Sequence, residues 1–219
     1  MSTVDRRSFL KSAAAGSGAL ALAGPLQAFA ARAAGAAPED GGRHGGGNPS
    51  YGPIAPVADN TTGQELLALP AGFQYWSFGD VGSPMSDGLP TPAAHDGMAA
   101  FPWGRKIRLV RNHEVRGAGT AFGPADLAYD AGAGGGNTIV EFDPRNPGSP
   151  RSWGVLSGTS TNCAGGLTPW LSWLTCEETT ETLGKPPGCV LEAPAWANGF
   201  RQATPIPSMG RFAHEALVV

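Results

Sequence analysis

Residues 171–178 read Leu-Ser-Trp-Leu-Thr-Cys-Glu-Glu, an apolar run that ends in two glutamates. Two further runs end in the same manner: residues 107–114 read Ile-Arg-Leu-Val-Arg-Asn-His-Glu, and residues 209–215 read Met-Gly-Arg-Phe-Ala-His-Glu. In a β-propeller, successive blades deliver the ends of their strands to one central channel. This repetition therefore favours an all-β propeller with glutamates at its strand ends.

Other short apolar runs, separated by Gly, Pro, Asn and Asp clusters, support an all-β fold. The chain holds 33 Gly and 20 Pro among 219 residues, and both are poor residues for helix interiors. Residues 63–69, before Pro70, are the one candidate for a helical turn, and residues 143–148 predict a turn between two strands. Periodicity alone does not separate a propeller from a sandwich or a barrel. The predicted strands are Gln74–Phe78, Lys106–Val110, Asn137–Phe142, Ser152–Leu156, Leu171–Cys176 and Gly188–Glu192.

The N-terminus has the pattern of a twin-arginine export signal. Arg6 and Arg7 precede twenty residues without a charge, Ser12 to Ala31, and small residues follow that suit a signal peptidase. A membrane anchor is the alternative, but Pro25 and Gln27 and the scarcity of large side chains weaken it. We expect delivery to the periplasm or the medium by the twin-arginine machinery, with no stable membrane anchor after cleavage. The expected domains are a signal peptide at 1–33, a flexible linker at 34–60 and a folded domain at 61–219.

The charge of the chain excludes one class of partner. Its net charge is −3, and removal of residues 1–33 leaves 11 basic and 17 acidic residues, a net charge of −6. A nucleic-acid-binding domain shows a basic patch instead. We therefore expect no nucleic-acid partner.

The densest group of chemically useful residues surrounds Cys163. Gly158 precedes this cysteine and Gly165 and Gly166 follow it. Glu177 and Glu178 come next in this group, with Glu177 eleven positions after Gly166. A thiolate with two carboxylates is a mixed ligand set: thiolates suit iron, zinc or copper, and carboxylates suit calcium or ferric iron. The alternative is a disulfide between Cys163 and Cys176, because disulfides are the usual state of cysteines in exported proteins.

Two His-Glu pairs at strand ends add weaker candidates. They end in Glu114 and Glu215, and each alone is more typical of a surface or core pair. Each pair follows a side chain that could contact an anion: Asn112 precedes the first pair and Arg211 precedes the second. Arginine forms paired hydrogen bonds with phosphate. A surface salt bridge is the alternative for Arg211.

Six motifs in this order resemble the PhoX family of exported bacterial alkaline phosphatases. They lie at residues 69–75, 96–101, 109–114, 162–170, 173–178 and 209–215, and the twin-arginine signal also suits that family. The resemblance implies a β-propeller and an active site with Fe(3+) and Ca(2+) that hydrolyses phosphomonoesters. Family members are considerably longer, so we expect the chain to be the N-terminal portion of such a propeller. Leu171, Ser172 and Cys189 depart from the family pattern.

Site residues follow from the matching motifs. The family's cysteine ligand of iron falls on Cys163, and its calcium-binding glutamate falls on Glu178. We expect Glu215 to be a further metal ligand. Glu177 and Glu114 complete the expected metal ligands, and Asn112 and Arg211 are the expected catalytic contacts. The resemblance thus favours a thiolate ligand over the disulfide.

Two other functions remain open. A non-catalytic exported propeller that serves as a binding module would hold calcium for structure and no iron. Another metal-dependent propeller hydrolase, such as a lactonase, would share the metals but not the substrate. Metal analysis of the purified protein separates the first alternative from an iron-dependent phosphatase.

The export signal yields a direct prediction. Replacing both arginines, Arg6→Lys with Arg7→Lys, removes the paired guanidinium groups that the export pathway reads. We expect uncleaved precursor to accumulate in the cytoplasm, measured by cell fractionation and immunoblotting. Normal delivery of the double variant to the periplasm would contradict the assignment of a twin-arginine export signal.

Overall fold

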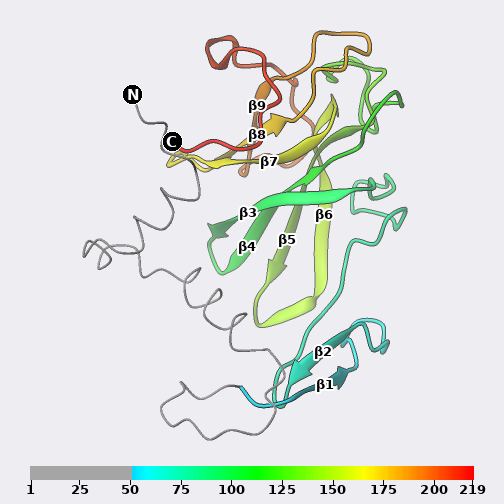
Figure 1. The fold of residues 1–219 in the computed structure, drawn as a ribbon. Coiled ribbons are helices and arrows are strands. Elements are labelled where there is room, and N and C mark those ends of the chain that lie inside the picture. Colours follow the sequence, from blue (N-terminus) through cyan, green and yellow to red (C-terminus); the bar gives the residue numbers. More distant parts are fainter. Residues whose placement is uncertain (1–50) are drawn as a thin grey trace, which may run out of the picture. The chain divides into compact units, whose positions relative to one another are not determined.

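The computed structural model describes residues 51–219, so the predicted signal peptide and most of the predicted linker lie outside the described residues. The described part is all-β, with three antiparallel sheets ordered β1-β2, β3-β4-β5-β6 and β7-β8-β9 (Figure 1). These sheets do not close into a barrel or propeller within residues 51–219. The elements are β1 (Ile54–Val57), β2 (Leu67–Pro70), β3 (His95–Trp103), β4 (Lys106–His113), β5 (Gly135–Asp143), β6 (Asn146–Thr159), β7 (Asn162–Leu167), β8 (Ser172–Glu177), β9 (Val190–Pro194) and a short 3-10 helix, η1 (Pro207–Met209).

Most strands from β4 onward coincide with a predicted run, and β7 (Asn162–Leu167) is the exception. β4, β5, β6, β8 and β9 each contain or overlap a predicted strand, and the turn at Pro144 and Arg145 joins β5 to β6 as expected. β5 is buried over residues 135–141 and β6 over residues 153–159, so both faces of these two strands are covered there. These buried stretches include the polar residues Asn137, Thr138 and Glu141, so they do not show a simple alternation of polar and apolar residues.

Two predictions near the start of the domain are wrong. Residues 74–78 form no strand, because the Asp59 carboxylate accepts the backbone N–H of Ser77 at 2.9 Å, and this replaces a strand partner. The predicted helical turn at 63–69 gives way to β2, which pairs with β1. The residue before Pro70 favours an extended backbone, which suits a strand. β1 lies inside the predicted linker, and the folded unit begins at Tyr51.

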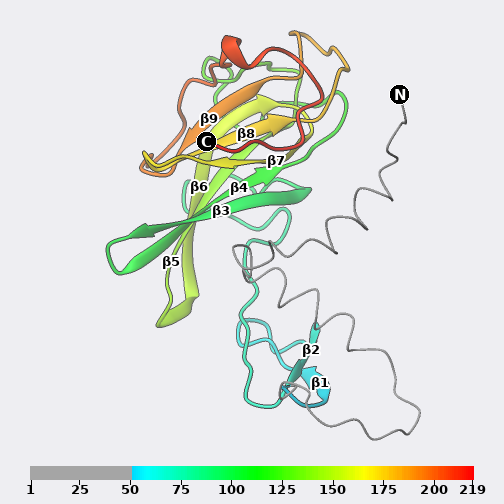
Figure 2. The same cartoon turned by 60° about the vertical axis from the view of Figure 1, so that its left-hand side comes forward.

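The four-stranded and three-stranded sheets share one hydrophobic core. Figures 1 and 2 show β7, β8 and β9 lying across one end of the β3–β6 sheet. No helix among residues 51–219 has the length and apolar character that a membrane span requires. The residues that fill the core between the sheets include Phe101, Val110, Ile139, Trp153, Val155, Leu156, Trp173, Leu191 and Ala193.

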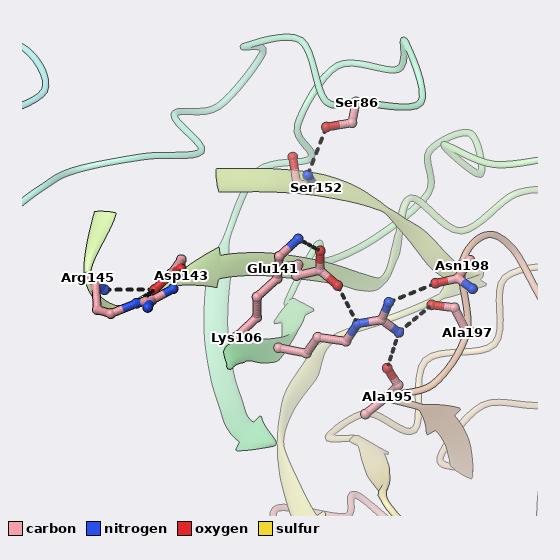
Figure 3. A network of polar contacts seen from close by, with 10 residues as sticks. Ser86, Lys106, Glu141, Asp143, Arg145, Ser152, Ala195, Ala197 and Asn198 are labelled. Atoms are coloured by element: carbon pink, nitrogen blue, oxygen red, sulfur yellow. Dashed lines mark hydrogen bonds and ion pairs between the residues drawn. The ribbon is translucent and has the colours of Figure 1, made fainter. Parts of the chain in front are cut away.

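A buried charge network joins the two sheets beside this core (Figure 3). Arg108 of β4 is 4% exposed, and its Nε donates to Glu141 of β5 at 2.9 Å. The remaining guanidinium nitrogens donate to the Ala195 carbonyl at 2.9 Å and to Asn198 at 2.8 Å, both just beyond β9. Lys106 supplies a second cation to the same carboxylate at 2.7 Å. The guanidinium therefore ties the end of the three-stranded sheet to the four-stranded one.

The Glu141→Gln variant tests this network. It leaves the buried Arg108 charge without its carboxylate, which costs about 3 kcal/mol or more when one partner of a buried pair is removed. The Lys106→Met variant is the matched control, because Lys106 is 47% exposed and its removal leaves Glu141 paired with Arg108, so we expect a loss of about 1 kcal/mol or less. We expect urea denaturation to show a large decrease in the free energy of unfolding for Glu141→Gln and a small decrease for Lys106→Met. Equal losses would contradict the assigned role.

The same variant should show a defined pH dependence. Burial alone would raise the pKa of the Glu141 carboxyl, but hydrogen bonds from Lys106 and Arg108 outweigh it, and the pKa is lowered. A carboxyl with a lowered pKa stabilises the folded state above its unfolded pKa, and that contribution is lost as the pH falls through the folded pKa. The difference in the free energy of unfolding between wild type and Glu141→Gln should therefore become smaller as the pH falls into the acid range.

Candidate metal centre

Three of the predicted ligands converge in the structure. Cys163 lies on β7, Glu178 directly follows β8, and Glu215 lies in the segment after η1. One ligand atom from each lies within 4.8 Å of the other two. Cys163 is buried, Glu178 is half-buried and Glu215 is exposed, so the group opens to solvent on the Glu215 side. Residues separated by up to 52 positions thus form one potential cation site.

Backbone hydrogen bonds bring the three chain segments together. The N–H of Glu178 donates to the Thr161 carbonyl at 2.9 Å, which fixes the end of β8 against the start of β7. The N–H of His214 donates to the Glu177 carbonyl at 3.0 Å, and this bond lays the final segment beside β8. In Figure 1 this segment, drawn in red, runs along β7 toward the C-terminus. Glu215 therefore reaches Cys163 without belonging to a strand.

Small residues let β7 approach its neighbours closely. A Cβ at Gly165 would lie 2.0 Å from the carbonyl oxygen of Leu174 on β8. The sequence of β7, Asn-Cys-Ala-Gly-Gly-Leu, has no β-branched residue, so its composition did not predict a strand. The glycine content reflects close packing of the strand that carries the cysteine.

The charges of the group suit a bound cation. Burial raises the pKa of the Cys163 thiol, and the nearby negative charges of Glu215 and Glu178 raise it further. Within residues 51–219, no ion pair involves either glutamate. Acidic groups that converge without a positive partner repel one another, and a metal ion relieves this repulsion while favouring the thiolate. The donor set and its uncompensated charge therefore fit a metal.

The three cysteines are free and buried, so the disulfide alternative is wrong in this structure. The Cys163 Sγ instead contacts the carbonyl oxygens of His214 at 3.3 Å and Glu215 at 3.2 Å. The Cys189 thiol contacts the Arg211 guanidinium and not Cys163 or Cys176. The thiol of Cys163 remains available as a ligand.

Glu177 lies outside this group. Its side chain is 2% exposed, and its two oxygens accept the backbone N–H groups of Ser160 at 2.9 Å and Cys189 at 3.0 Å. Burial raises its pKa in spite of these hydrogen bonds. Successive side chains of a strand point to opposite faces, so adjacent glutamates at the end of β8 serve different surroundings. In this structure Glu177 connects two backbone segments.

Glu114 and Arg211 are also placed away from the three converging ligands. Glu114 forms an ion pair with Arg116. Arg211 donates to Cys189 Sγ at 2.8 Å and to the Pro187 carbonyl at 3.2 Å, and its hydrogen bonds reach none of the three converging residues. The structure therefore does not bring these two side chains to the metal group.

Asn112 lies in the core between the sheets and is fully buried. Its Nδ2 donates to the carbonyls of Cys163 at 3.1 Å and Ala164 at 3.0 Å. Its Oδ1 accepts from Trp173 and Thr175, both at 2.9 Å. All of its donors and its acceptor are engaged, so in this structure the amide has no free atom for a substrate anion.

Sequence reasoning missed the residues that orient this amide. Trp173 and Thr175 alternate along β8 on the face that meets β4, and Asn137 of β5 donates a further hydrogen bond to Asn112 Oδ1. The sequence offers hydrogen-bonding side chains at alternate positions of the predicted strand, Trp173 and Thr175, and the structure shows that all residues of this strand are buried. Buried polar groups need partners, so such positions indicate a network.

The geometry agrees with the family comparison. A family model described as alkaline phosphatase PhoX matches the chain in two overlapping segments, residues 49–147 and 131–219. No curated protein and no solved structure matched the chain. The matched family is metal-dependent and typically exported. Because the matched segments together cover well over half of the sequence, the chain belongs to the alkaline phosphatase PhoX family.

Proposed function

We propose that this chain is part of an exported, metal-dependent alkaline phosphatase that hydrolyses phosphomonoesters. The observation that carries the proposal is the convergence of Cys163, Glu178 and Glu215 in a chain of this family. These residues combine one soft ligand with two hard ones. A thiolate favours iron and carboxylates favour calcium, so we assign Fe(3+) to the Cys163 side and Ca(2+) to the glutamates.

The same residues explain how an acidic protein could accept an anionic ester. The chain without residues 1–33 carries a net charge of −6, which repels phosphate esters. Cations bound at the group supply Lewis-acid stabilisation of negative charge on the phosphoryl oxygens. Glu215 lies on the exposed side, where a substrate can enter, while Cys163 anchors the buried side. The three side chains would thus hold the bound cations at a position that a phosphate ester can reach from solvent.

Export and the propeller belong to the same proposal. The paired arginines at 6 and 7 support the twin-arginine route, which carries folded proteins and so permits metals to be loaded before export. The β3–β6 sheet has the four antiparallel strands of a propeller blade, and β7–β9 supply strands of the next. Strand ends of both sheets would then line the active-site channel.

Metal binding by the glutamates gives one test. We expect Ca(2+) alone to stabilise the purified chain by about 2.7 kcal/mol at a free concentration one hundred times its dissociation constant, because it binds the folded state selectively. The double variant Glu178→Gln with Glu215→Gln should lose this stabilisation. Glu192→Gln is the control, since Glu192 accepts a hydrogen bond from Trp170 on the surface and lies outside the group. Thermal denaturation with and without Ca(2+) measures the effect, and equal stabilisation of all three proteins would contradict the assignment.

Loss of the thiolate gives a second test, in metal content and activity. In the metal-loaded protein, Cys163→Ser should lose iron and nearly all hydrolysis of a chromogenic aryl phosphate, while bound calcium partly remains. Removal of a soft ligand weakens iron binding more than calcium binding. Elemental analysis and initial rates measure both quantities. Full iron content with full activity would favour a structural cysteine, and calcium without iron in the wild type would favour the binding-module alternative.

A further inference from the structure

The main chain of Cys163 is held from the neighbouring sheet by a buried amide. Asn112 of β4 donates from Nδ2 to the carbonyl oxygens of Cys163 at 3.1 Å and Ala164 at 3.0 Å. These two carbonyls belong to β7 at its bulge, where the pairing with β8 shifts between residues 162 and 165. At the bulge these two carbonyls have no regular partner on β8, and the Asn112 amide donates to them instead.

The orientation of this amide is determined by its surroundings. Trp173 Nε1 lies 2.9 Å from Asn112 Oδ1, and an indole N–H can only donate. The oxygen must therefore face Trp173, and the NH₂ group must face β7. Thr175 Oγ1, also 2.9 Å from the oxygen, is free to donate there. A rotated amide would lose these hydrogen bonds and direct its oxygen at two carbonyl oxygens.

A second contact comes from the backbone of β3. A Cβ at Gly97 would lie 2.5 Å from the Cys163 carbonyl oxygen and 2.8 Å from the Ala164 Cα, so β7 lies directly on the glycine. Gly97 does not adopt a positive φ, and its backbone conformation is therefore open to alanine. The contact with Cys163, and not the local conformation, requires glycine here.

We propose that Asn112 and Gly97 are positioning residues that set the place of the Cys163 thiolate relative to Glu178 and Glu215. The inference rests on the proposed metal centre and adds two residues that contact no substrate. Both act on the cysteine main chain, one by attraction and one by close approach. The four-stranded sheet thus supplies no ligand to the group but determines where the ligand of β7 lies.

Co(2+) binding to the full chain tests this positioning, because a cobalt–thiolate bond gives a charge-transfer absorption band. Gly97→Ala introduces the clash with the Cys163 carbonyl, and Asn112→Asp keeps an acceptor for Trp173 but removes both donors. Gly123→Ala is the matched control, since its added Cβ would lie 2.3 Å from the Phe200 ring and touch no ligand residue. Metal-free melting temperature, Co(2+) affinity and band intensity are measured for each protein, with circular dichroism to confirm folding.

We expect Gly97→Ala and Asn112→Asp to bind Co(2+) about 10–100-fold more weakly, with a weaker charge-transfer band, as for other residues that orient metal ligands. Gly123→Ala should lower the melting temperature but retain the wild-type affinity and band. A purely structural role would lower melting temperatures without changing the band.

The outcomes separate the two proposals. A wild type without the band, or a band that survives Cys163→Ser, would overturn the metal centre itself. A wild-type band that Gly97→Ala leaves unchanged in affinity and intensity would overturn the positioning role alone. If Asn112→Asp does not fold, Gly97→Ala decides. A Gly97→Ala chain that does not fold also contradicts the inference, because the proposed effect is confined to the position of Cys163.

Discussion

The side-chain amide of Asn112 is the interaction on which the two sheets and the candidate site jointly depend. It lies on β4, accepts hydrogen bonds from β5 and β8, and donates to the main chain of β7. A hydrogen bond contributes only about 1 kcal/mol net, but a buried polar group left without a partner costs about 1–3 kcal/mol. An amide at the junction of four strands is satisfied by one arrangement of those strands. It therefore contributes more to the uniqueness of the packing than to its strength.

Two groups of charge near the sheet junction differ in a way that separates structure from function. The carboxylate of Glu141 is matched by two cations, and Arg108 is further satisfied by carbonyls beyond β9. Glu178 and Glu215 converge on a buried thiol and form no ion pair within residues 51–219. The carboxylate of Glu141 is thus neutralised within the fold, whereas the two glutamates beside the thiol keep the negative charge on which the proposed metal centre rests.

Close backbone packing explains why this site is built on small residues. Gly165 allows β7 to lie against β8, and Gly97 allows it to lie against β3. The strand that carries Cys163 thus packs closely against main chain of two other strands, and Cys163 is buried while Glu215 is exposed. Preorganisation of this kind would lower the cost of binding a cation at the proposed centre.

The sequence by itself determined the β class, most strands from β4 onward and three residues, Cys163, Glu178 and Glu215, whose side chains converge. It could do so because apolar runs and turn residues are local signals, and because the motifs around Cys163, Glu178 and Glu215 are short and specific. Only the tertiary structure placed Glu177 and Glu114, which were also expected as ligands, outside the group formed by Cys163, Glu178 and Glu215, because their side chains meet other neighbours. It also placed Asn112 in the core and Arg211 beside Cys189, away from the ligand group. Whether a polar side chain faces a site or a buried carbonyl depends on strand register and on residues distant in the chain, and neither is written in a local pattern.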